Sequence, residues 1–241
     1  MIFGDGVTIV AELGPNHNGQ FQNALRLIES AKDAGADFCK LQAYLPSELV
    51  ALRGDGPAPE PWGSQGWTMR DLYESAATPF EWFPELVAHA KDIGIGWFAS
   101  VFGAESLAML EGLDCPAYKI AAMEWSDSGL RHMVEATGKP VVRSMPLAQS
   151  DDGGPWNVYC PPGYPQTELH LARIRSGFYW GFSYHGQDPN VPAYAVVAGA
   201  RYIETHIHLE DEPSRLEAGF AFTGRGFKEM VHGIRKAEAL L

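Results

Sequence analysis

Three ionisable residues alternate along one short stretch near the C-terminus. Residues 201–210 read RYIETHIHLE after Gly199, and the stretch is short, β-branched and alternating, which is typical of a strand. On a strand, Glu204, His206 and His208 share one face. At the end of a barrel strand that face points into a shared mouth, where two imidazoles indicate a metal. A solvent-facing edge strand with incidental histidines is the alternative, and the rest of the chain decides between them.

Polar side chains recur at the ends of the other expected strands. They are Glu12, Lys40 with Gln42, Ser100, Lys119 with Glu124, Ser144, Tyr164, Ser183 with His185, and His206. Two lysines with several hydroxyls form an anion cradle, for which phosphate is the obvious guest. His185 and His206, on adjacent strands with room left over, form an open site for a divalent metal. Glu12, Glu124 and Glu217 are candidates for proton transfer, so the set indicates carbon–carbon or phosphoryl chemistry on a phosphorylated substrate.

Each of these residues also has a structural interpretation when it is taken singly. Lys119 could be a surface lysine, and Glu124 could complement the dipole at the start of a helix. His185 could be a loop residue, and His208 is interpreted as structural. His17, in the first turn of the chain, is interpreted as a turn or helix-cap residue rather than a ligand.

A strand–helix alternation must position the polar residues. An apolar strand over 7–13, a turn over 14–19, a helix that ends at Gly35 and a strand over 37–44 form a βαβ unit, whose crossover requires a parallel sheet. Further strands are expected at 96–101, 116–121, 141–144, 156–160, 178–183 and 201–210, and an amphipathic helix closes the chain. Eight such units predict a (β/α)₈ TIM barrel.

Two details refine this prediction of the fold. The segment 150–155, after the fifth strand, is too short and too rich in Gly and Asp for a full helix, so the fifth helix is expected to be shortened or missing. A doubly wound open sheet is the competing α/β fold. It is disfavoured because no G-x-G-x-x-G follows the first strand.

Length and composition set further limits. The 241 residues, 46% of them hydrophobic, suit one domain over 1–241 with a well-buried core. A net charge of −12 without any basic run argues against nucleic acid or a membrane surface as a partner. Three cysteines without a C-x-x-C pair indicate reduced thiols. No signal peptide and no apolar run of about 18 residues are found, which predicts a cytoplasmic protein.

Residues 45–79 interrupt the alternation with a segment rich in glycine and proline. Such an excursion is too long for an ordinary connection in a compact domain. Long barrel loops often serve as lids or substrate walls, and Trp62, Trp67 and Tyr73 could form one here. A disordered insertion is the alternative.

Several segments, in order along the chain, resemble the sialic acid synthase family (N-acetylneuraminate synthase and its relatives). They are IVAELGPNHNG at 9–19, AGAD with KLQ at 34–42, PAYKIA at 116–121, TGKP at 137–140, YP at 164–165, GFSYH at 181–185 and IETH at 203–206. The resemblance covers essentially the whole chain, and its first and last motifs are specific.

The resemblance implies a barrel that condenses phosphoenolpyruvate with an N-acylated amino sugar, releasing phosphate and a nine-carbon keto acid. It implies a divalent metal, manganese or magnesium, held by His185 and His206 as a Lewis acid for the sugar aldehyde and the attacking water. The remaining roles that it implies are phosphate binding by Lys40 and Lys119 with Ser100, Ser144 and Ser183, substrate binding by Glu12, Gln42 and Tyr164, and proton transfer by Glu124. Glu217 takes the place of an aspartate near the end of the barrel.

Departures from the family pattern fall on the sugar half of the expected site. Relatives carry a C-terminal antifreeze-like domain that lends an arginine to the partner subunit, whereas this chain ends at Leu241. That arginine is expected to be missing unless a separate polypeptide supplies it, and a homodimer would need another surface. Ala122 replaces a serine, Tyr184 replaces an aspartate before His185, and Pro161–Pro162 displaces polar residues.

The sequence therefore predicts a transferase that condenses phosphoenolpyruvate with an amino sugar or another sugar aldehyde. Two alternatives stay open. One is a barrel that binds ligands without turnover, which the missing arginine and Tyr184 motivate. The other is a metal-dependent aldolase or isomerase that acts on an open-chain sugar and ignores phosphoenolpyruvate.

Overall fold

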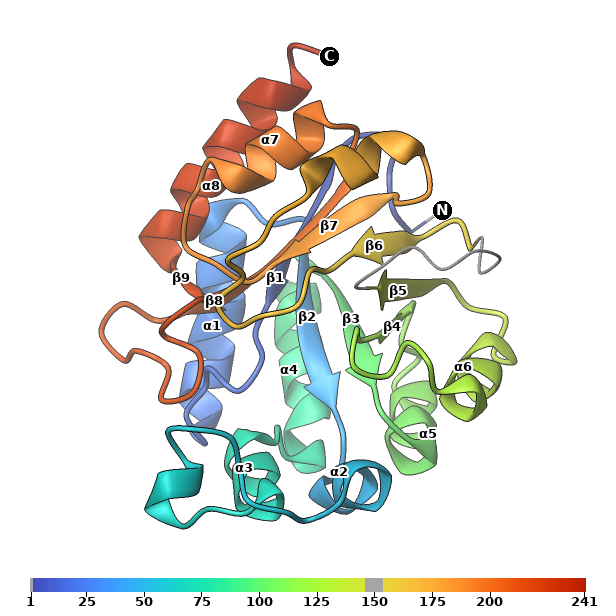
Figure 1. The fold of residues 1–241 in the computed structure, drawn as a ribbon, viewed down its shortest axis with the longest axis vertical. Helices are drawn as coiled ribbons and strands as arrows, with labels where there is room; N and C mark the ends of the chain where they lie inside the picture. The colour runs from blue at the N-terminus through green and yellow to red at the C-terminus, as the bar shows by residue number, and fades with distance from the viewer. Residues whose placement is uncertain (1, 146–153) are drawn as a thin grey trace.

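A closed parallel barrel forms the centre of the computed structural model, which describes residues 2–145 and 154–241 (Figure 1). Its strands are β1 (Thr8–Glu12), β2 (Phe38–Ala43), β3 (Gly96–Val101), β4 (Tyr118–Ile120), β5 (Val141–Met145), β6 (Asn157–Tyr159), β7 (Gly181–Tyr184) and β8 (Tyr202–His208). Each pairs with the next in parallel, and β8 pairs back onto β1 with His206 opposite Glu12. A short strand, β9 (Phe222–Thr223), pairs in parallel with the last residues of β8. The (β/α)₈ TIM barrel is confirmed.

Helices cover the outside of the barrel (Figure 1). They are α1 (Phe21–Ala34), α4 (Phe83–Asp92), α5 (Ala104–Gly112), α6 (Ser128–Glu135), α7 (Val191–Val197) and α8 (Gly224–Glu238), with a 3₁₀ helix, η3 (Leu171–Ser176), between β6 and β7. The connection from β5 to β6 passes through 146–153, which lie outside the described residues. The shortened or missing fifth helix therefore stays a prediction. In the part of the chain that is described, no helix is both long and apolar enough to cross a membrane.

The first helix shows why the sequence pattern predicts these elements well. Ala24, Leu27, Ile28 and Ala31 recur at helical spacing and are buried against the barrel. Gly35 ends the helix at φ 92°, and its N–H reaches the carbonyls of the last turn. A residue without Cβ adopts this left-handed conformation at little cost, so the glycine fixes where α1 stops and β2 begins.

An aromatic plug closes the N-terminal end of the barrel. The Phe3 ring contacts five other rings, with centroids 5.4–6.1 Å away, from residues at or near the starts of strands: Phe38, Phe98, Trp156, Trp180 and Tyr202. Aromatic pairs in such edge-on geometry add to the energy gained from burial alone. Because this end is filled with apolar rings, polar side chains inside the barrel are left to the opposite, C-terminal end.

The segment 45–79 is folded, so a disordered insertion is wrong. It contains α2 (Pro46–Arg53), the 3₁₀ turn η1 (Gly63–Gln65) and α3 (Met69–Ala76), and the turn η2 (Phe80–Trp82) then leads into α4. Leu49, Tyr44 and Tyr73 form a small second core. Glu48 Oε1 accepts the backbone N–H groups of Glu105 at 2.9 Å and Ser106 at 3.2 Å, which ties α2 to the start of α5. The insertion is thus fixed to the barrel.

His17 is a buried turn residue between β1 and α1, as the sequence predicts. Its Nδ1 accepts the backbone N–H of Gly19 at 3.0 Å, and its Nε2 lies 3.1 Å from Thr78 Oγ1. Only the neutral ring can accept the Gly19 hydrogen bond. Burial lowers the His17 pKa from 6.5 to about 4, although the charge of Glu217 partly opposes the shift.

We expect this histidine to make the fold sensitive to mild acid. Since the pKa is lower in the folded state, the unfolded chain takes up the proton first as the pH falls. The contribution of His17 is complete above about pH 6.5 and is lost toward pH 4, a change of about 3 kcal/mol in the free energy of unfolding. Urea unfolding at pH 7 and pH 4.5 measures it. His17→Gln should lose less stability across this range than the wild type, and equal losses would contradict the prediction.

Candidate active site

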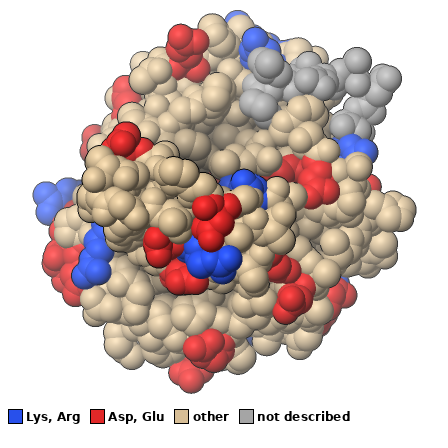
Figure 2. Space-filling model, turned by 60° about the horizontal axis from the view of Figure 1, so that its bottom comes forward, with Lys and Arg blue, Asp and Glu red and all other residues tan. Residues whose placement is uncertain are grey.

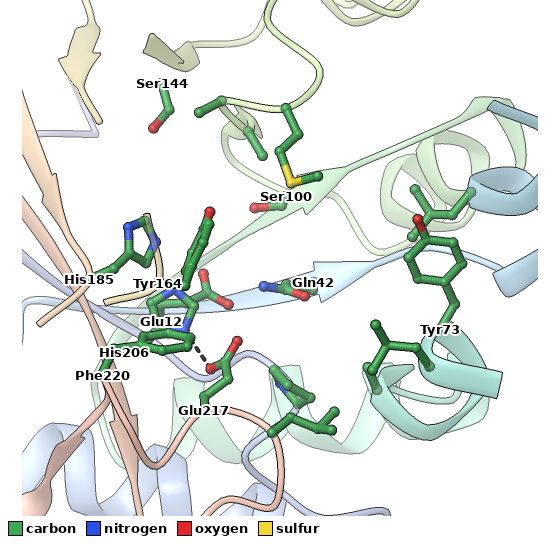
Figure 3. Close-up of a pocket in the computed structure, with 18 of the residues that line it drawn as sticks. Glu12, Gln42, Tyr73, Ser100, Ser144, Tyr164, His185, His206, Glu217 and Phe220 are labelled. Atoms are coloured by element: carbon green, nitrogen blue, oxygen red, sulfur yellow. Dashed lines mark hydrogen bonds and ion pairs between the residues drawn. The ribbon is translucent and has the colours of Figure 1, made fainter. Parts of the chain in front are cut away.

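A cavity of about 730 Å³ opens at the C-terminal ends of the barrel strands. All twelve residues that the sequence predicts for a site line it: Glu12, Lys40, Gln42, Ser100, Lys119, Glu124, Ser144, Tyr164, Ser183, His185, His206 and Glu217. Strand register brings them together, since Gln42 pairs with Ser100 across β2 and β3, and Ser100 pairs with Lys119 across β3 and β4. Figure 3 draws residues that line this cavity, ten of them labelled, around the space between the barrel and the insertion.

One buried carboxylate organises the floor of this cavity. Glu204, on β8, accepts two hydrogen bonds from Lys119 Nζ, at 2.8 and 3.0 Å, and lies 3.6 Å from Lys40 Nζ. The Ser183 hydroxyl donates to Glu204 at 3.2 Å, and the Tyr202 hydroxyl donates to its other oxygen. The sequence places Glu204 on the inner face of its strand, but its role as counterion to both lysines emerges only from the closed barrel.

Lys40 has a second carboxylate and a hydroxyl as neighbours. It forms an ion pair with Glu12, at the end of β1, and its Nζ donates to Ser100 Oγ at 2.8 Å. Burial alone would lower the pKa of Lys40, but Glu12 and Glu204 outweigh burial and raise it. For Lys119, burial dominates and the pKa lies below its ordinary value despite Glu204. The two buried lysines therefore differ in how firmly they hold their protons.

Glu204 itself is kept ionised by these partners. Burial would raise its pKa, but the positive charges of Lys119 and Lys40, together with their hydrogen bonds, lower it well below the ordinary range. An ionised carboxylate between two ammonium groups stabilises each of them in a cavity that excludes most water. The floor is thus a compensated charge cluster before any ligand binds.

We expect loss of the Glu204 charge to destabilise the protein. Glu204→Gln leaves two buried ammonium groups with one carboxylate, and removing one partner of a buried pair costs about 3–5 kcal/mol. Urea unfolding at pH 7 measures this loss. Glu210→Gln is the matched control, because Glu210 pairs with Arg225 at the surface, where such pairs contribute about 0–1 kcal/mol. A loss for Glu204→Gln as small as that of the control would show that the cluster is not a structural requirement.

The two predicted metal-ligating histidines lie side by side at one rim. The His185 and His206 rings, from the ends of β7 and β8, have centroids 4.9 Å apart. His206 Nδ1 donates to Glu217 Oε2 at 2.6 Å, which leaves the Nε2 lone pair for a cation (Figure 3). The Asn16 side-chain amide donates to the same Glu217 oxygen at 2.9 Å. A carboxylate that orients an imidazole in this way is common behind metal-binding histidines.

The donor set fits a divalent metal with an open coordination sphere. Two imidazoles would occupy two positions of such a metal and leave the others to water and substrate. Over residues 2–145 and 154–241, no group of three or more His, Cys, Asp and Glu side chains is arranged to hold an ion. Gln166 donates from Nε2 to His185 Nδ1 at 2.9 Å and to the Pro161 carbonyl at 2.7 Å. Ligation through His185 Nε2 would need the hydrogen on Nδ1, so this amide contact would change.

One buried hydroxyl at the floor of the cavity lacks a hydrogen-bond partner among the described residues. Ser144, at the end of β5, is 1% exposed, and its Oγ has no hydrogen-bond partner among the described residues. A buried polar atom without a partner costs about 1–3 kcal/mol. A ligand that bonds to Ser144 would relieve this cost, so the atom is a favourable contact point inside the cavity.

The insertion supplies the outer wall of the cavity. Trp62 and Tyr73, two of the three aromatic residues predicted for a wall, line it, whereas Trp67 does not. Across from them, Tyr164 packs on His185 with ring centroids 4.4 Å apart and on Phe220 at 5.3 Å. Basic and acidic side chains lie close together around a hollow near the centre of the face shown in Figure 2. The cavity therefore has a charged floor and a largely aromatic wall.

Sequence reasoning misses two residues that matter to this geometry. Arg53, at the end of α2, forms an ion pair with the buried Glu124. The sequence does contain a signal for Arg53. An acidic chain that binds an anion must concentrate its few cations, and the cations of the insertion are Arg53 and Arg70. Gln166, which contacts His185, follows a Tyr–Pro pair and carries no recognisable sequence signal.

A parallel barrel with ionisable residues grouped at its C-terminal mouth defines the class of (β/α)₈ enzyme scaffolds. Within that class the chain belongs to the NeuB family, whose family model matches residues 27–153 and 164–241. The sequence resemblance is thereby confirmed. The unmatched stretch 154–163 contains Pro161–Pro162, one of the departures seen in the sequence.

Individual relatives agree with this assignment. The chain is 34% identical to pseudaminic acid synthase of Campylobacter jejuni, over 98% of this chain and 75% of that protein. It is 32% identical to pseudaminic acid synthase of Helicobacter pylori, over 95% and 74% respectively. Among solved structures, spore coat polysaccharide biosynthesis protein SpsE of Bacillus subtilis superposes with a TM-score of 0.80 at 28% identity, covering 98% of this chain and 70% of that one.

Proposed function

We propose that this chain condenses phosphoenolpyruvate with the aldehyde of a sugar, in particular an N-acyl amino sugar, and releases inorganic phosphate. The observation that carries the proposal is the convergence of two buried lysines, three serines and an imidazole pair on one cavity. The relatives named pseudaminic acid synthase support it. The product would be a keto acid of the sialic acid type.

The floor offers the contacts that a phosphorylated enol needs. Lys40 and Lys119 present ammonium groups, and Ser100 and Ser183 are already bonded to the same cluster. The unpartnered hydroxyl of Ser144 faces the same cavity. Charge-assisted hydrogen bonds of this kind are the strong ones, so the anion would bind at the floor and leave the outer cavity to the sugar.

The reaction balances with water as the third reactant. C3 of phosphoenolpyruvate forms a bond to the aldehyde carbon, and the aldehyde oxygen takes a proton from a carboxyl group. Glu124 is one proposed donor, and it must first take up a proton because it is ion-paired with Arg53. Water then adds at C2, and the C2–O bond to phosphate breaks with release of inorganic phosphate. Glu12 and Glu217 are the further candidates for proton transfer. A divalent cation, Mn²⁺ or Mg²⁺, held by His185 and His206 would supply Lewis acidity toward the aldehyde oxygen.

We expect phosphate release from phosphoenolpyruvate to depend on the sugar and on Lys119. The assay follows inorganic phosphate with Mn²⁺ and N-acetylmannosamine or a related aldose. Lys119→Met should lower kcat/KM at least about a hundredfold, because a charged hydrogen bond to the reacting anion is lost. Lys91→Met, on the exposed side of α4, is the matched control and should keep wild-type activity.

The same measurements separate the two alternatives. A barrel without turnover would bind phosphoenolpyruvate in a calorimetric titration and release no phosphate with any of a panel of aldoses. An aldolase or isomerase would consume an open-chain sugar and would neither bind nor need phosphoenolpyruvate. Sugar-dependent release of phosphate is the outcome that neither alternative gives.

We expect metal removal to abolish turnover. EDTA should stop phosphate release and Mn²⁺ should restore it, because the imidazole pair would lose its cation. His206→Ala should also weaken Mn²⁺ binding at least tenfold, measured by electron paramagnetic resonance of free Mn²⁺ without any substrate. His132→Ala, an exposed histidine of α6, serves as the control. Unchanged Mn²⁺ affinity in His206→Ala would place the metal elsewhere.

We also propose a cellular compartment and a domain organisation for this protein. The cysteines Cys39, Cys115 and Cys160 are buried free thiols, which suits a reducing compartment, and we propose the cytoplasm. We propose residues 1–241 as one barrel domain. A homodimer, or a separate polypeptide of the antifreeze-like type, remains the predicted source of any group that the sugar side lacks.

A further inference from the structure

An arginine from the insertion meets a buried carboxylate from the barrel. Arg53, the last residue of α2, forms an ion pair with Glu124, which follows β4, and both line the cavity. The Glu124 side chain is 0% exposed, and neither of its oxygens has a hydrogen-bond partner among the described residues apart from this ion pair. The Arg53 side chain keeps 21% of its surface exposed. The guanidinium therefore keeps donors that a ligand can reach, and Glu124 is its buried counterion.

The backbone of Arg53 is held in place by the way in which α2 is anchored. The N–H of Gly54 bonds to the Val50 carbonyl at 2.8 Å and closes the helix just after Arg53. One turn earlier, Leu49 packs into the small second core and Glu48 bonds to the start of α5. The guanidinium itself contacts Glu124 and lies 3.7 Å from Met123 Sδ. A guanidinium restrained in this way loses less side-chain entropy when it binds a ligand, which favours a recognition role.

The charges around the cavity limit what this pair can recognise. Among the described residues that line the cavity, the cations are Lys40, Lys119 and Arg53, and the carboxylates are Glu12, Glu60, Glu124, Glu204 and Glu217. Lys40 and Lys119 are committed to the floor, and Arg53 is neutralised by Glu124. The outer half of the cavity therefore offers the guanidinium as a donor beside its buried counterion, without a net positive charge.

We propose that Arg53 and Glu124 form the specificity-determining pair for the sugar, an inference that rests on the proposed function. The guanidinium donates to an acyl carbonyl or hydroxyl oxygen of the sugar, and the buried Glu124 carboxylate orients the guanidinium as its counterion. Glu124 also neutralises the arginine, so that a phosphorylated sugar gains no attraction there. Arg53 thus acts on the acceptor half of the reaction and leaves the phosphoenolpyruvate half unaffected.

Substitutions at Arg53 test the first part of this inference. Arg53→Ala should raise the KM for N-acetylmannosamine, or for the best aldose of the panel, about tenfold to a hundredfold, since a hydrogen bond to a charged group is lost. The KM for phosphoenolpyruvate should change less than about twofold. The KM of Arg53→Lys for the sugar should lie between the values of the wild type and Arg53→Ala. Added guanidinium ion at millimolar concentration should partly restore the KM of Arg53→Ala. Leu52→Ala, exposed on the same helix, is the matched control and should match the wild type.

Calorimetry with the sugar, with and without phosphoenolpyruvate, makes the result independent of turnover. Glu124→Gln should bind a 6-phosphorylated aldose at least about tenfold more tightly than the wild type does, because the guanidinium is no longer neutralised. This variant keeps a side chain of the same size, so it also answers the question if Arg53→Ala does not fold.

Failure of the inference differs from failure of the proposed function. If the wild type releases phosphate and Arg53→Ala keeps its KM for the sugar, the pair is structural and the inference is overturned, while the function stands. If the wild type binds the sugar without turnover and Arg53→Ala loses that binding, the pair is supported and the function fails. A wild type that neither binds nor converts any aldose overturns both, and a wild type that prefers the phosphorylated sugar overturns the role of Glu124.

Discussion

The ionic contact between Glu204 and two lysines is the interaction on which the rest of the site depends. An isolated ammonium group inside a barrel is expensive to desolvate, and two of them near each other are more so. Glu204 compensates both Lys40 and Lys119. This contact exists only when β8 closes onto β1, since closure carries Glu204 across the barrel toward strands β2 and β4. Barrel closure and site assembly are therefore one event.

The compensated floor also explains why the opposite end of the barrel is apolar. Charges are stabilised by partners and hydrogen bonds at the mouth, whereas the base is filled by rings around Phe3. Ammonium and hydroxyl groups that are fixed before a ligand arrives need little reorganisation when negative charge develops near them. The fold thus separates an apolar end from an end that carries the ionisable residues, which is the usual arrangement in barrel enzymes.

The sequence predicts the floor of the site better than it predicts the wall. Residues at strand ends converge in any closed parallel barrel, so Glu12, Ser144 and His185 can be placed together from strand positions alone. Arg53 is different, because its position depends on how α2 docks through Glu48, a contact between segments 57 residues apart. Gln166 lies in a segment without regular structure. Its contact with His185 depends on the backbone conformation of that segment, which no hydrophobic periodicity predicts.

The counterion role of Glu204 lies between these two cases. Alternation along β8 places its side chain on the inner face, which the sequence indicates correctly. Its contact with Lys119 depends on the stagger of strands across the barrel, because residues at the same depth come from different positions along their strands. The structure gives this stagger through the register of each pair, for instance Ser183 opposite Glu204. A sequence pattern does not predict this stagger.

A division between floor and wall has a physical consequence for substrate choice. The floor is built from strand ends whose geometry the barrel constrains, so its arrangement of charged and hydroxyl groups cannot change without cost to the fold. The wall comes from an insertion that is anchored at a few points, chiefly Leu49 and Glu48. A change at Arg53 or Trp62 would alter the acceptor half of the cavity and leave the Glu204 cluster intact. Under the proposed function, specificity can therefore vary on the insertion while the barrel keeps the reaction.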